Sequence, residues 1–448
     1  MSDLYSKKDG EKVWNAFKQM HDYIDKSYQV IVKSDSNNNY TNQKGKVMYD
    51  GVSTLLNTNV GHQNQEIIEE ISKQLTTLEN TSLFTCTDDV AIACSKKLCE
   101  LSENHFYSAF FTNSGSEACD TAIKIVLKYW NNLGDNRRII VSLKGAYHGS
   151  SIGAMMLAHE GYSMDDYGIP YDSFHQTPVP DPLERPENLT QEEWVQECVD
   201  AFENYCKEKE GKIAAIFMEL IQLSNAVNVL PLEFVQKIYN ICKEHNILIV
   251  IDEVATGFGR TGTLFASQYY GIWGDLMMVA KGITSGYIPM GGVLVTKDVF
   301  YNFYGKKADE KILEHGFTTG GHPVACAAAI KNIEQLLENK YVENSETLGT
   351  YLLNGLQASI GDSKLVECIR GKGLMISIIF KDIQVKNMEE WGIAELLTNF
   401  LINKGLLLYP DDKNILIIAP CLNCLQSDCD MIIEKIQDSV KKVEFLVQ

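Results

Sequence analysis

Four near-continuous apolar segments constrain the fold of this chain more than any other feature. They read RRIIVSL, KIAAIFMEL, NILIVIDEV and DLMMVA, and helical patterns such as PLEFVQKIYNICKEH lie between them. Strands that are apolar along their whole length belong to parallel sheets covered on both faces. The alternation of strands and helices is typical of a doubly wound α/β domain. The sequence therefore predicts an α/β fold with a central, mostly parallel sheet.

A second, smaller domain is expected, because 448 residues exceed the length of one typical domain. From about residue 331 the pattern changes to a long helix, two strands (LMISIIF and NILIIAP) and a closing helix, which indicates an α+β unit. We expect the N-terminal segment, with a helix over residues 11–27, to complete it. Residues 162–187 are rich in Pro, Asp and Gly, which predicts a surface insertion. The predicted division is 1–74 and 331–448 for the small domain and 75–330 for the large one.

Charge and cysteine content exclude several classes of protein. The chain has 40 basic and 59 acidic residues, a net charge of −19, which disfavours nucleic-acid binding and polybasic contact with a membrane. The start, MSDLYSKKDG, lacks the pattern of a signal peptide, and no apolar run approaches the roughly 18 residues that span a bilayer. Twelve scattered cysteines fit reduced thiols, so we expect a cytoplasmic protein. In CLNCLQSDC no second pair completes four ligands, and no metal site is predicted.

Polar residues that directly follow the apolar strands are the candidate ligand-binding residues, because ligands of parallel sheets lie at the carboxyl ends of the strands. Ser114, Gly115 and Ser116 open an amphipathic helix, where free N–H groups and hydroxyls can bind an anion. An ordinary helix N-cap explains these residues equally well. Tyr147 follows RRIIVSL and either packs locally or stacks on a flat ligand.

Asp252 and Lys281 end the two most informative strands. A carboxylate after ILIVI needs a positive partner, which is either Arg260, in a structural pair, or a protonated ring nitrogen of a ligand. A lysine after DLMMVA either reaches solvent or, with its pKa lowered by burial, serves as an amine nucleophile. An anion site, an aromatic platform, a buried carboxylate and an amine nucleophile together meet the needs of pyridoxal 5′-phosphate.

At this point the sequence resembles the class III pyridoxal-phosphate aminotransferases. The resemblance covers about residues 22–440 and is carried by TNSGSEACDTAIK, GAYHG, VIDEVATGFGRTG, VAKGITSGYIPMGG and HGFTTGGHPVACAAA. It implies the fold type I of these transferases, with a large cofactor-binding domain and a smaller α+β domain. It also implies a ping-pong transfer of an amino group from a primary amine to a 2-oxo acid, with pyruvate as the expected acceptor.

The resemblance assigns roles residue by residue. Lys281 matches the lysine that forms the Schiff base with the cofactor, and Asp252 matches the partner of its pyridine nitrogen. Thr318 matches a threonine that binds the phosphate of the neighbouring subunit's cofactor, which implies a homodimer. The other matching positions are Gly115 and Ser116, with Ser114 beside them, for the phosphate, Val254 and Tyr147 for the two faces of the ring, and Glu219 at the end of the preceding strand.

Three departures from the family pattern concern the substrate. The family often reads EPVxGxGG after the glutamate, whereas this chain has the bulkier ELIQLSNAVNVLP. Leu56 occupies the position of a tryptophan in the branch that acts on ω-amino acids, and Tyr409 that of an arginine that binds the substrate carboxylate. Tyrosine cannot form the bidentate charged pair of arginine, although Lys413 could replace it. We therefore expect the enzyme to prefer an amine donor bulkier than β-alanine or taurine. We also expect it to depend less on a carboxylate in that donor.

Other activities remain open on these motifs. Aminomutases, racemases and decarboxylases of the same fold group use the same lysine. A donor amine attached to a peptide or to a carrier would also fit the altered substrate positions. A non-catalytic binding protein with this fold would be expected to have lost Lys281 or Asp252, and both are present.

Overall fold

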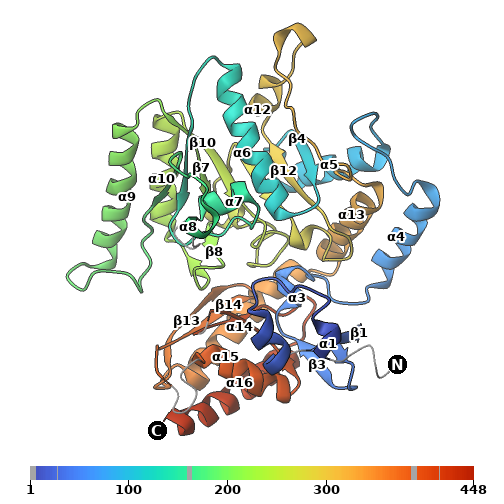
Figure 1. Ribbon diagram of the computed structural model, residues 1–448, viewed down its shortest axis with the longest axis vertical. Coiled ribbons are helices and arrows are strands. Elements are labelled where there is room, and N and C mark those ends of the chain that lie inside the picture. Colours follow the sequence, from blue (N-terminus) through green and yellow to red (C-terminus); the bar gives the residue numbers. More distant parts are fainter. Residues whose placement is uncertain (1–6, 28, 159–163, 385–390, 413, 448) are drawn as a thin grey trace.

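The computed structural model describes residues 7–27, 29–158, 164–384, 391–412 and 414–447. Figure 1 shows a large unit, in which helices cover a central sheet, above a smaller unit that contains both ends of the chain. Strands of the small unit come from both the N-terminal (blue) and the C-terminal (red) parts of the sequence.

The sheet of the large unit has seven strands and is mostly parallel. Their spatial order is β4 (Ser108–Thr112), β12 (Gly291–Val295), β11 (Leu276–Val279), β10 (Leu248–Asp252), β7 (Ile213–Met218), β5 (Ile139–Leu143) and β6 (Phe174–Thr177). Only β12 runs antiparallel to its neighbours in this sheet. The four apolar segments of the sequence form β5, β7, β10 and β11, so the predicted fold class is confirmed.

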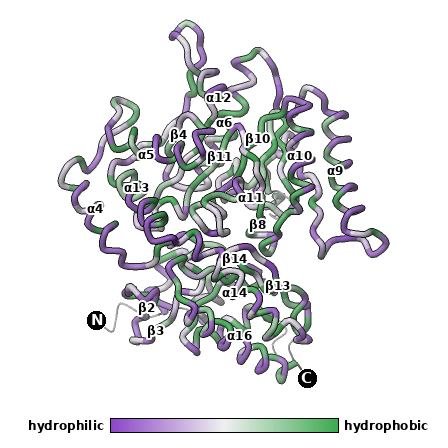
Figure 2. Tube along the Cα trace, turned by 180° about the vertical axis from the view of Figure 1, so that it is seen from behind, coloured by the Kyte–Doolittle hydropathy of each residue, from purple (hydrophilic) through white to green (hydrophobic). Residues whose placement is uncertain are grey.

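Both faces of this sheet are covered, which explains the uninterrupted apolar strands. In β10, Ile249 and Ile251 face the cluster that includes Phe202 of α9 (Gln191–Glu208) and Phe234 of α10 (Leu232–Glu244). The alternate residues of β10 join the opposite cluster under α6 (Gly115–Asn132). Figure 2 shows green, hydrophobic chain along β10 in the interior and purple chain along much of the peripheral α4 (Gln65–Thr77).

The small unit combines two sheets. One is antiparallel, in the order β13 (Val366–Lys372), β14 (Met375–Phe380), β17 (Ile415–Ile418) and β16 (Tyr409–Asp412). The other contains β1 (Ile31–Ser34), β2 (Asn39–Asn42), β3 (Val47–Asp50) and β15 (Leu406–Leu407), and β15 pairs in parallel with β3. This pairing joins the N-terminal segment to the C-terminal part of the chain. The division at residues 74 and 330 stays a prediction.

The remaining helices and strands complete the two units. They are α3 (Ser53–Leu56), α5 (Asp89–Leu101), α7 (Ile152–Leu157), α8 (Met164–Tyr167), α11 (Ala266–Tyr270), α12 (Lys297–Asn302), α13 (Pro323–Glu338), α14 (Tyr341–Ile360), α15 (Ile393–Asn403) and α16 (Gln426–Val447), with the short strands β8 (Ile221–Gln222) and β9 (Asn228–Val229).

Two sequence predictions about local structure are wrong. The helix expected over residues 11–27 is broken into α1 (Lys7–Gly10), α2 (Met20–Asp22) and a π-turn at Tyr23–Ser27. Its apolar residues Val13, Trp14 and Phe17 are exposed, and helices depend on packing of an apolar face for stability. The stretch 162–187 contains α8 and the strand β6, which pairs only with β5 at the sheet edge. An edge strand with the sequence FHQT carries little apolar signal.

Arg260 ties the two units together. It is fully buried, and its Nη1 donates hydrogen bonds to the carbonyls of Leu374 (3.0 Å) and Pro420 (2.6 Å). Its Nη2 donates to Ser53 Oγ (3.0 Å) and Asn59 Oδ1 (2.9 Å). The sequence had left open whether Arg260 pairs with Asp252. The structure gives Arg260 the structural role.

Arg260→Lys is expected to lower the free energy of unfolding by about 2–4 kcal/mol, because one ammonium cannot replace four hydrogen bonds from a planar guanidinium. Chemical denaturation measures the loss. Arg138→Lys is the matched control, since the guanidinium of Arg138 donates to carbonyls nearer the surface. Equal stability of the Arg260→Lys and Arg138→Lys variants would contradict the tie between the units.

Candidate active site

The carboxyl ends of five strands of the large sheet meet at a cavity of about 350 Å³. Residues that follow β4, β5, β7, β10 and β11 line it. The sequence-predicted residues among them are Ser114, Gly115, Ser116, Tyr147, Glu219, Asp252, Val254 and Lys281. The structure thus brings together these eight positions, six of which were predicted from the ends of strands and two, Glu219 and Val254, from the resemblance to the family. The cavity lining also includes residues that were not predicted as site residues, namely Asn57, Asn113, His148 and Leu223.

Asp252 is held by two hydrogen bonds at the end of β10. Its Oδ2 lies 2.7 Å from Nδ1 of His148, and its Oδ1 accepts the N–H of Val254 at 2.9 Å. Burial alone would lower the pKa of His148, but the hydrogen bond and charge of Asp252, with the charge of Glu219, raise it. The contact with His148 therefore fixes the orientation of Asp252. The sequence placed His148 at a strand end, but its contact with Asp252 spans 104 residues.

Lys281 follows β11 and lies among acidic groups. Burial lowers its pKa, while the charges of Glu219, Asp252 and Asp411 act in the opposite direction. A lysine with a lowered pKa has a larger neutral fraction and is a better nucleophile. Its backbone has a left-handed φ of 47°, unusual for a lysine, which marks a position fixed by the surrounding structure.

Glu219 ends the neighbouring strand and contacts the loop that carries Tyr147. Its Oε2 accepts the backbone N–H of Tyr147 at 2.9 Å. Burial raises the pKa of Glu219 to about 7, the charge of Asp252 adds to the rise, and His148 and Lys281 oppose it. Glu219 is thus a carboxyl group that can be protonated near neutral pH, next to Lys281.

The first turn of α6 forms one wall of the cavity. Ser114 is the N-cap, since its Oγ accepts the N–H of Glu117 at 3.2 Å, and the N–H groups of the next two residues point out of the helix start. Gly115 faces Val254, and a Cβ on Gly115 would lie 2.9 Å from Val254 Cγ1. Ser114 therefore caps the helix, and the same turn lines the cavity, whereas anion binding at this turn stays a prediction.

Leu56 does not line the cavity, unlike Asn57 directly after it. Its side chain is only 2% exposed and packs in the core with Val52 and Ala146. The loop turns through left-handed φ values at Ser53 (49°), Thr54 (63°) and Leu56 (56°). These values direct Leu56 into the core, a placement that the sequence pattern did not reveal.

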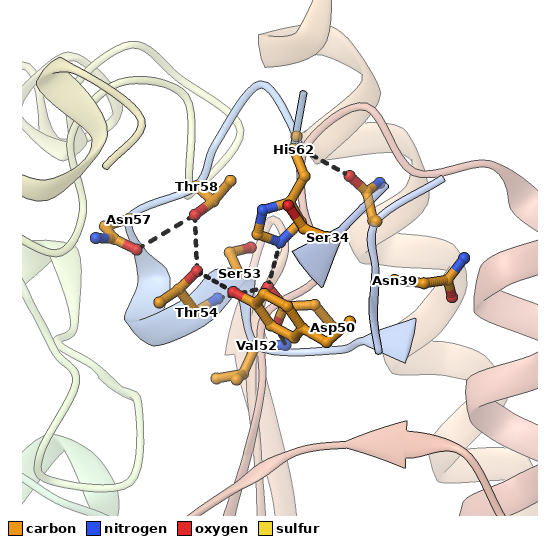
Figure 3. A network of polar contacts seen from close by, with 12 residues as sticks. Ser34, Asn39, Asp50, Val52, Ser53, Thr54, Asn57, Thr58 and His62 are labelled. Carbon is orange, nitrogen blue, oxygen red and sulfur yellow. Dashed lines mark hydrogen bonds and ion pairs between the residues drawn. The ribbon is translucent and has the colours of Figure 1, made fainter. Parts of the chain in front are cut away.

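A polar network holds this strained loop. Figure 3 shows Asp50 at its centre, with His62 on one side and the loop on the other. Asp50 accepts hydrogen bonds from the N–H groups of Val52 (3.2 Å) and Thr54 (2.7 Å), and its Oδ2 lies 2.8 Å from His62 Nε2. The Thr54 hydroxyl reaches that of Thr58 at 2.9 Å. Several hydrogen bonds to the same short loop can hold its backbone at unfavourable angles.

Tyr409 and Thr318 lie outside the cavity lining of this chain. Tyr409, in β16, is half-buried, and burial raises its pKa, with the charges of Asp411 and Tyr147 adding to the rise. Thr318 is exposed, while the adjacent Thr319 donates to Asn113 Oδ1 at 2.8 Å. Lys413, the alternative to the missing arginine, lies outside the described residues.

The sequence matches the family described as "Aminotransferase class-III" over residues 23–440. This match covers most of the chain. The chain belongs to the class III aminotransferases. It is 32% identical to adenosylmethionine-8-amino-7-oxononanoate aminotransferase of Anoxybacillus flavithermus, over 91% of this chain and 90% of that protein.

Solved aminotransferases have the same fold. An (S)-enantioselective omega-transaminase from Thermomicrobium roseum superposes with a TM-score of 0.91 at 30% identity, over 99% of this chain and 98% of that one. An amine transaminase from an uncultivated Pseudomonas species, solved with pyridoxal phosphate bound, has a TM-score of 0.90 at 26% identity, over 96% and 99%. This chain is thus an enzyme of pyridoxal-phosphate-dependent transamination.

The cavity residues fit this cofactor. Lys281 and Asp252 supply an amine and a carboxyl group in one cavity, and the absence of a Cβ at Gly115 leaves room beside Val254. The helix start of α6 offers N–H groups for a phosphate. Among the described residues, no helix is both long and apolar enough to cross a membrane.

Proposed function

We propose that this aminotransferase takes its amino group from an amine bulkier than small ω-amino acids and transfers it to a 2-oxo acid, pyruvate being the expected acceptor, by a ping-pong mechanism. Tyr409 carries the proposal, because it occupies the position at which the resemblance to the family places a carboxylate-binding arginine. A phenol offers one neutral hydrogen bond and cannot bind a carboxylate as arginine does.

Two further observations support a pocket different from that of the β-alanine branch. Leu223, from the loop that replaces the family's glycine-rich segment, lines the cavity. The Anoxybacillus relative is named for adenosylmethionine and 8-amino-7-oxononanoate, both larger than β-alanine. Leu56 contributes to this proposal only by setting the path of the loop that presents Asn57 to the cavity.

The residues of the chain have distinct roles in the proposed reaction. When bound, pyridoxal phosphate supplies an aldehyde and an electron-accepting ring. Lys281 would hold the cofactor through its amine and would move the proton of the donor carbon. Asp252, oriented by His148, would keep the ring nitrogen protonated. Ser114, Gly115 and Ser116 would bind the phosphate, and Val254 and Tyr147 would enclose the ring.

The enzyme is also proposed to be a homodimer in which Thr318 of each chain binds the phosphate at the other subunit's site. Two observations support this. Thr318 is exposed and does not contribute to the cavity of its own chain, and its neighbour Thr319 bonds to Asn113 at the cavity wall. Sedimentation of the purified protein tests the dimer, and a monomer with full cofactor affinity would refute the role of Thr318.

A panel of donors tests the proposed specificity. In the purified enzyme without any oxo acid, bulky or uncharged amines are expected to bleach the visible band of the lysine-bound cofactor, and pyruvate should restore it. With pyruvate as acceptor, kcat/KM should be about tenfold or more higher for the best of these amines than for β-alanine or taurine, since no arginine compensates for burying a carboxylate. Higher kcat/KM for β-alanine or taurine would refute the proposal.

A further inference from the structure

The hairpin of residues 220–230, which follows Glu219, forms one wall of the cavity, and we call it the wall hairpin. Its short strands β8 and β9 pair antiparallel, and Leu223 comes directly after β8. Leu223 is half-buried, because it packs against the core cluster that contains Ile221 and also lines the cavity. A wall residue of this size limits the space that a bound donor can occupy.

The wall hairpin has unfavourable backbone angles. Ala226 and Val227 have left-handed φ values of 47° and 52°, which residues other than glycine rarely adopt, β-branched ones least of all. Gln222 holds the hairpin from within the large unit, since its Nε2 donates to the carbonyl of Lys144 at 2.9 Å and its Oε1 accepts from Asn228 Nδ2 at 3.2 Å. Such a conformation persists only where the surrounding structure holds it.

Arg370 of β13 holds the wall hairpin from the small unit. Its Nε donates to the carbonyl of Ala226 at 2.8 Å, and its Nη2 donates to that of Asn225 at 2.6 Å. The same guanidinium forms a bidentate ion pair with Asp181, at 2.8 and 3.0 Å, and the side chain of Asp181 is only 2% exposed. Ser377 of β14 donates its hydroxyl to the Ala226 carbonyl at 2.6 Å. Because bidentate pairs are strong and directional, these contacts between the two units fix the position of the hairpin.

We propose that Leu223 is a specificity-determining residue, which excludes donors with a bulky branch on the amine-bearing carbon, and that Arg370 is the positioning residue that holds Leu223 in place. The inference rests on the proposed transamination of primary amines. The amine-bearing carbon reacts beside Lys281, so a branch on that carbon lies in the same cavity as Leu223. Bulk at the far end of the donor is not limited in this way.

Three isomeric donors test the role of Leu223: hexylamine, 2-aminohexane and 3-aminohexane, which differ in the branch on the amine-bearing carbon. The measurement is the second-order rate constant with which each amine, without any oxo acid, bleaches the visible band of the bound cofactor. In the wild type this rate constant should be about tenfold or more lower for 3-aminohexane than for hexylamine. Leu223→Ala should raise the ratio of 3-aminohexane to hexylamine by about tenfold. Leu223→Met conserves volume and should leave the ratio within about twofold of wild type.

A double-mutant cycle tests the positioning role of Arg370. Arg370→Gln alone should raise the same ratio by about threefold, but in the Leu223→Ala background it should change the ratio by less than about twofold. In the apoprotein it should also speed hydrogen exchange of the amides in residues 220–230. Arg370→Lys keeps the charge but loses the bidentate pair, so it should have an intermediate effect, and it takes the place of the glutamine variant if that variant does not fold.

Arg137→Gln is the matched control. Arg137 also bonds to a carboxylate, that of Asp135, and to backbone carbonyls, but it lies just before β5, at the opposite end of the sheet from the cavity. Its loss should lower the free energy of unfolding without changing the ratio of the two amines.

An unchanged ratio in Leu223→Ala, or equal rate constants for the three amines in the wild type, would overturn the inference while leaving transamination intact. Equal effects of Arg370→Gln on the ratio in both backgrounds would show that Arg370 does not act through Leu223. If none of the three amines bleaches the cofactor band of any variant, the proposed transamination of such amines fails, and the inference fails with it.

Discussion

Lys281→Ala is expected to abolish both turnover and covalent attachment of the cofactor while leaving the fold intact. Loss of the amine removes the nucleophile and the group that moves the proton, so kcat should fall by about 10⁴-fold or more. Borohydride reduction followed by mass spectrometry should find cofactor on the wild-type chain and none on the variant. Because burial lowers the pKa of Lys281, its removal relieves a desolvation cost, and the Tm of the apoprotein should not decrease.

Two variants serve as controls for this result. Lys297→Ala removes an exposed lysine of α12 and should retain full activity and cofactor attachment. Lys281→Arg keeps a positive charge but presents a group that does not deprotonate, so it should be as inactive as the alanine variant. Retained turnover in Lys281→Arg would show that charge alone suffices and that the amine does not take part in the chemistry.

The sequence was sufficient to predict residues whose role follows from a local rule. Asp252 and Lys281 each come directly after an apolar run, and a doubly wound sheet gathers such positions at one edge, so their convergence could be expected without coordinates. The same rule located Tyr147, whereas Glu219 came from the resemblance to the family. When apolar strands are covered on both faces, the residues that follow them have few other places to lie than the carboxyl edge of the sheet.

Features that depend on long-range contacts or on single backbone angles could not be predicted in this way. The contact of His148 with Asp252 joins residues far apart in the chain. The left-handed φ of Leu56 turns its side chain into the core, although its neighbour Asn57 lines the cavity. The register shift of β16 between Pro410 and Asp412 is likewise not revealed by any pattern in GLLLYPDDK.

Sequence prediction also failed where packing overrides a local pattern. Residues 11–27 have the composition of a helix, yet Trp14 is 89% exposed and no continuous helix forms. The strand β6 has a mainly polar sequence and exists because β5 offers it an open edge with four paired positions. In both cases the outcome is set by what the rest of the molecule offers for contact.

Asp252→Asn is expected to reduce kcat by about 10³-fold while retaining the fold and the bound cofactor, because an amide cannot hold the ring nitrogen protonated. Without Asp252, the largest influences that raise the pKa of His148 are lost, and burial leaves the imidazole neutral. In the wild type, the raised pKa of His148 contributes stability that is lost as the pH rises through this pKa. The Tm of the apo variant should therefore not show this dependence on pH.

Asp275→Asn is the control for this prediction. It alters a carboxylate that accepts the N–H of Ile249 at the opposite end of the sheet, and it should leave kcat unchanged. An Asp252→Asn enzyme within a few-fold of wild type would exclude Asp252 as the partner of the ring nitrogen.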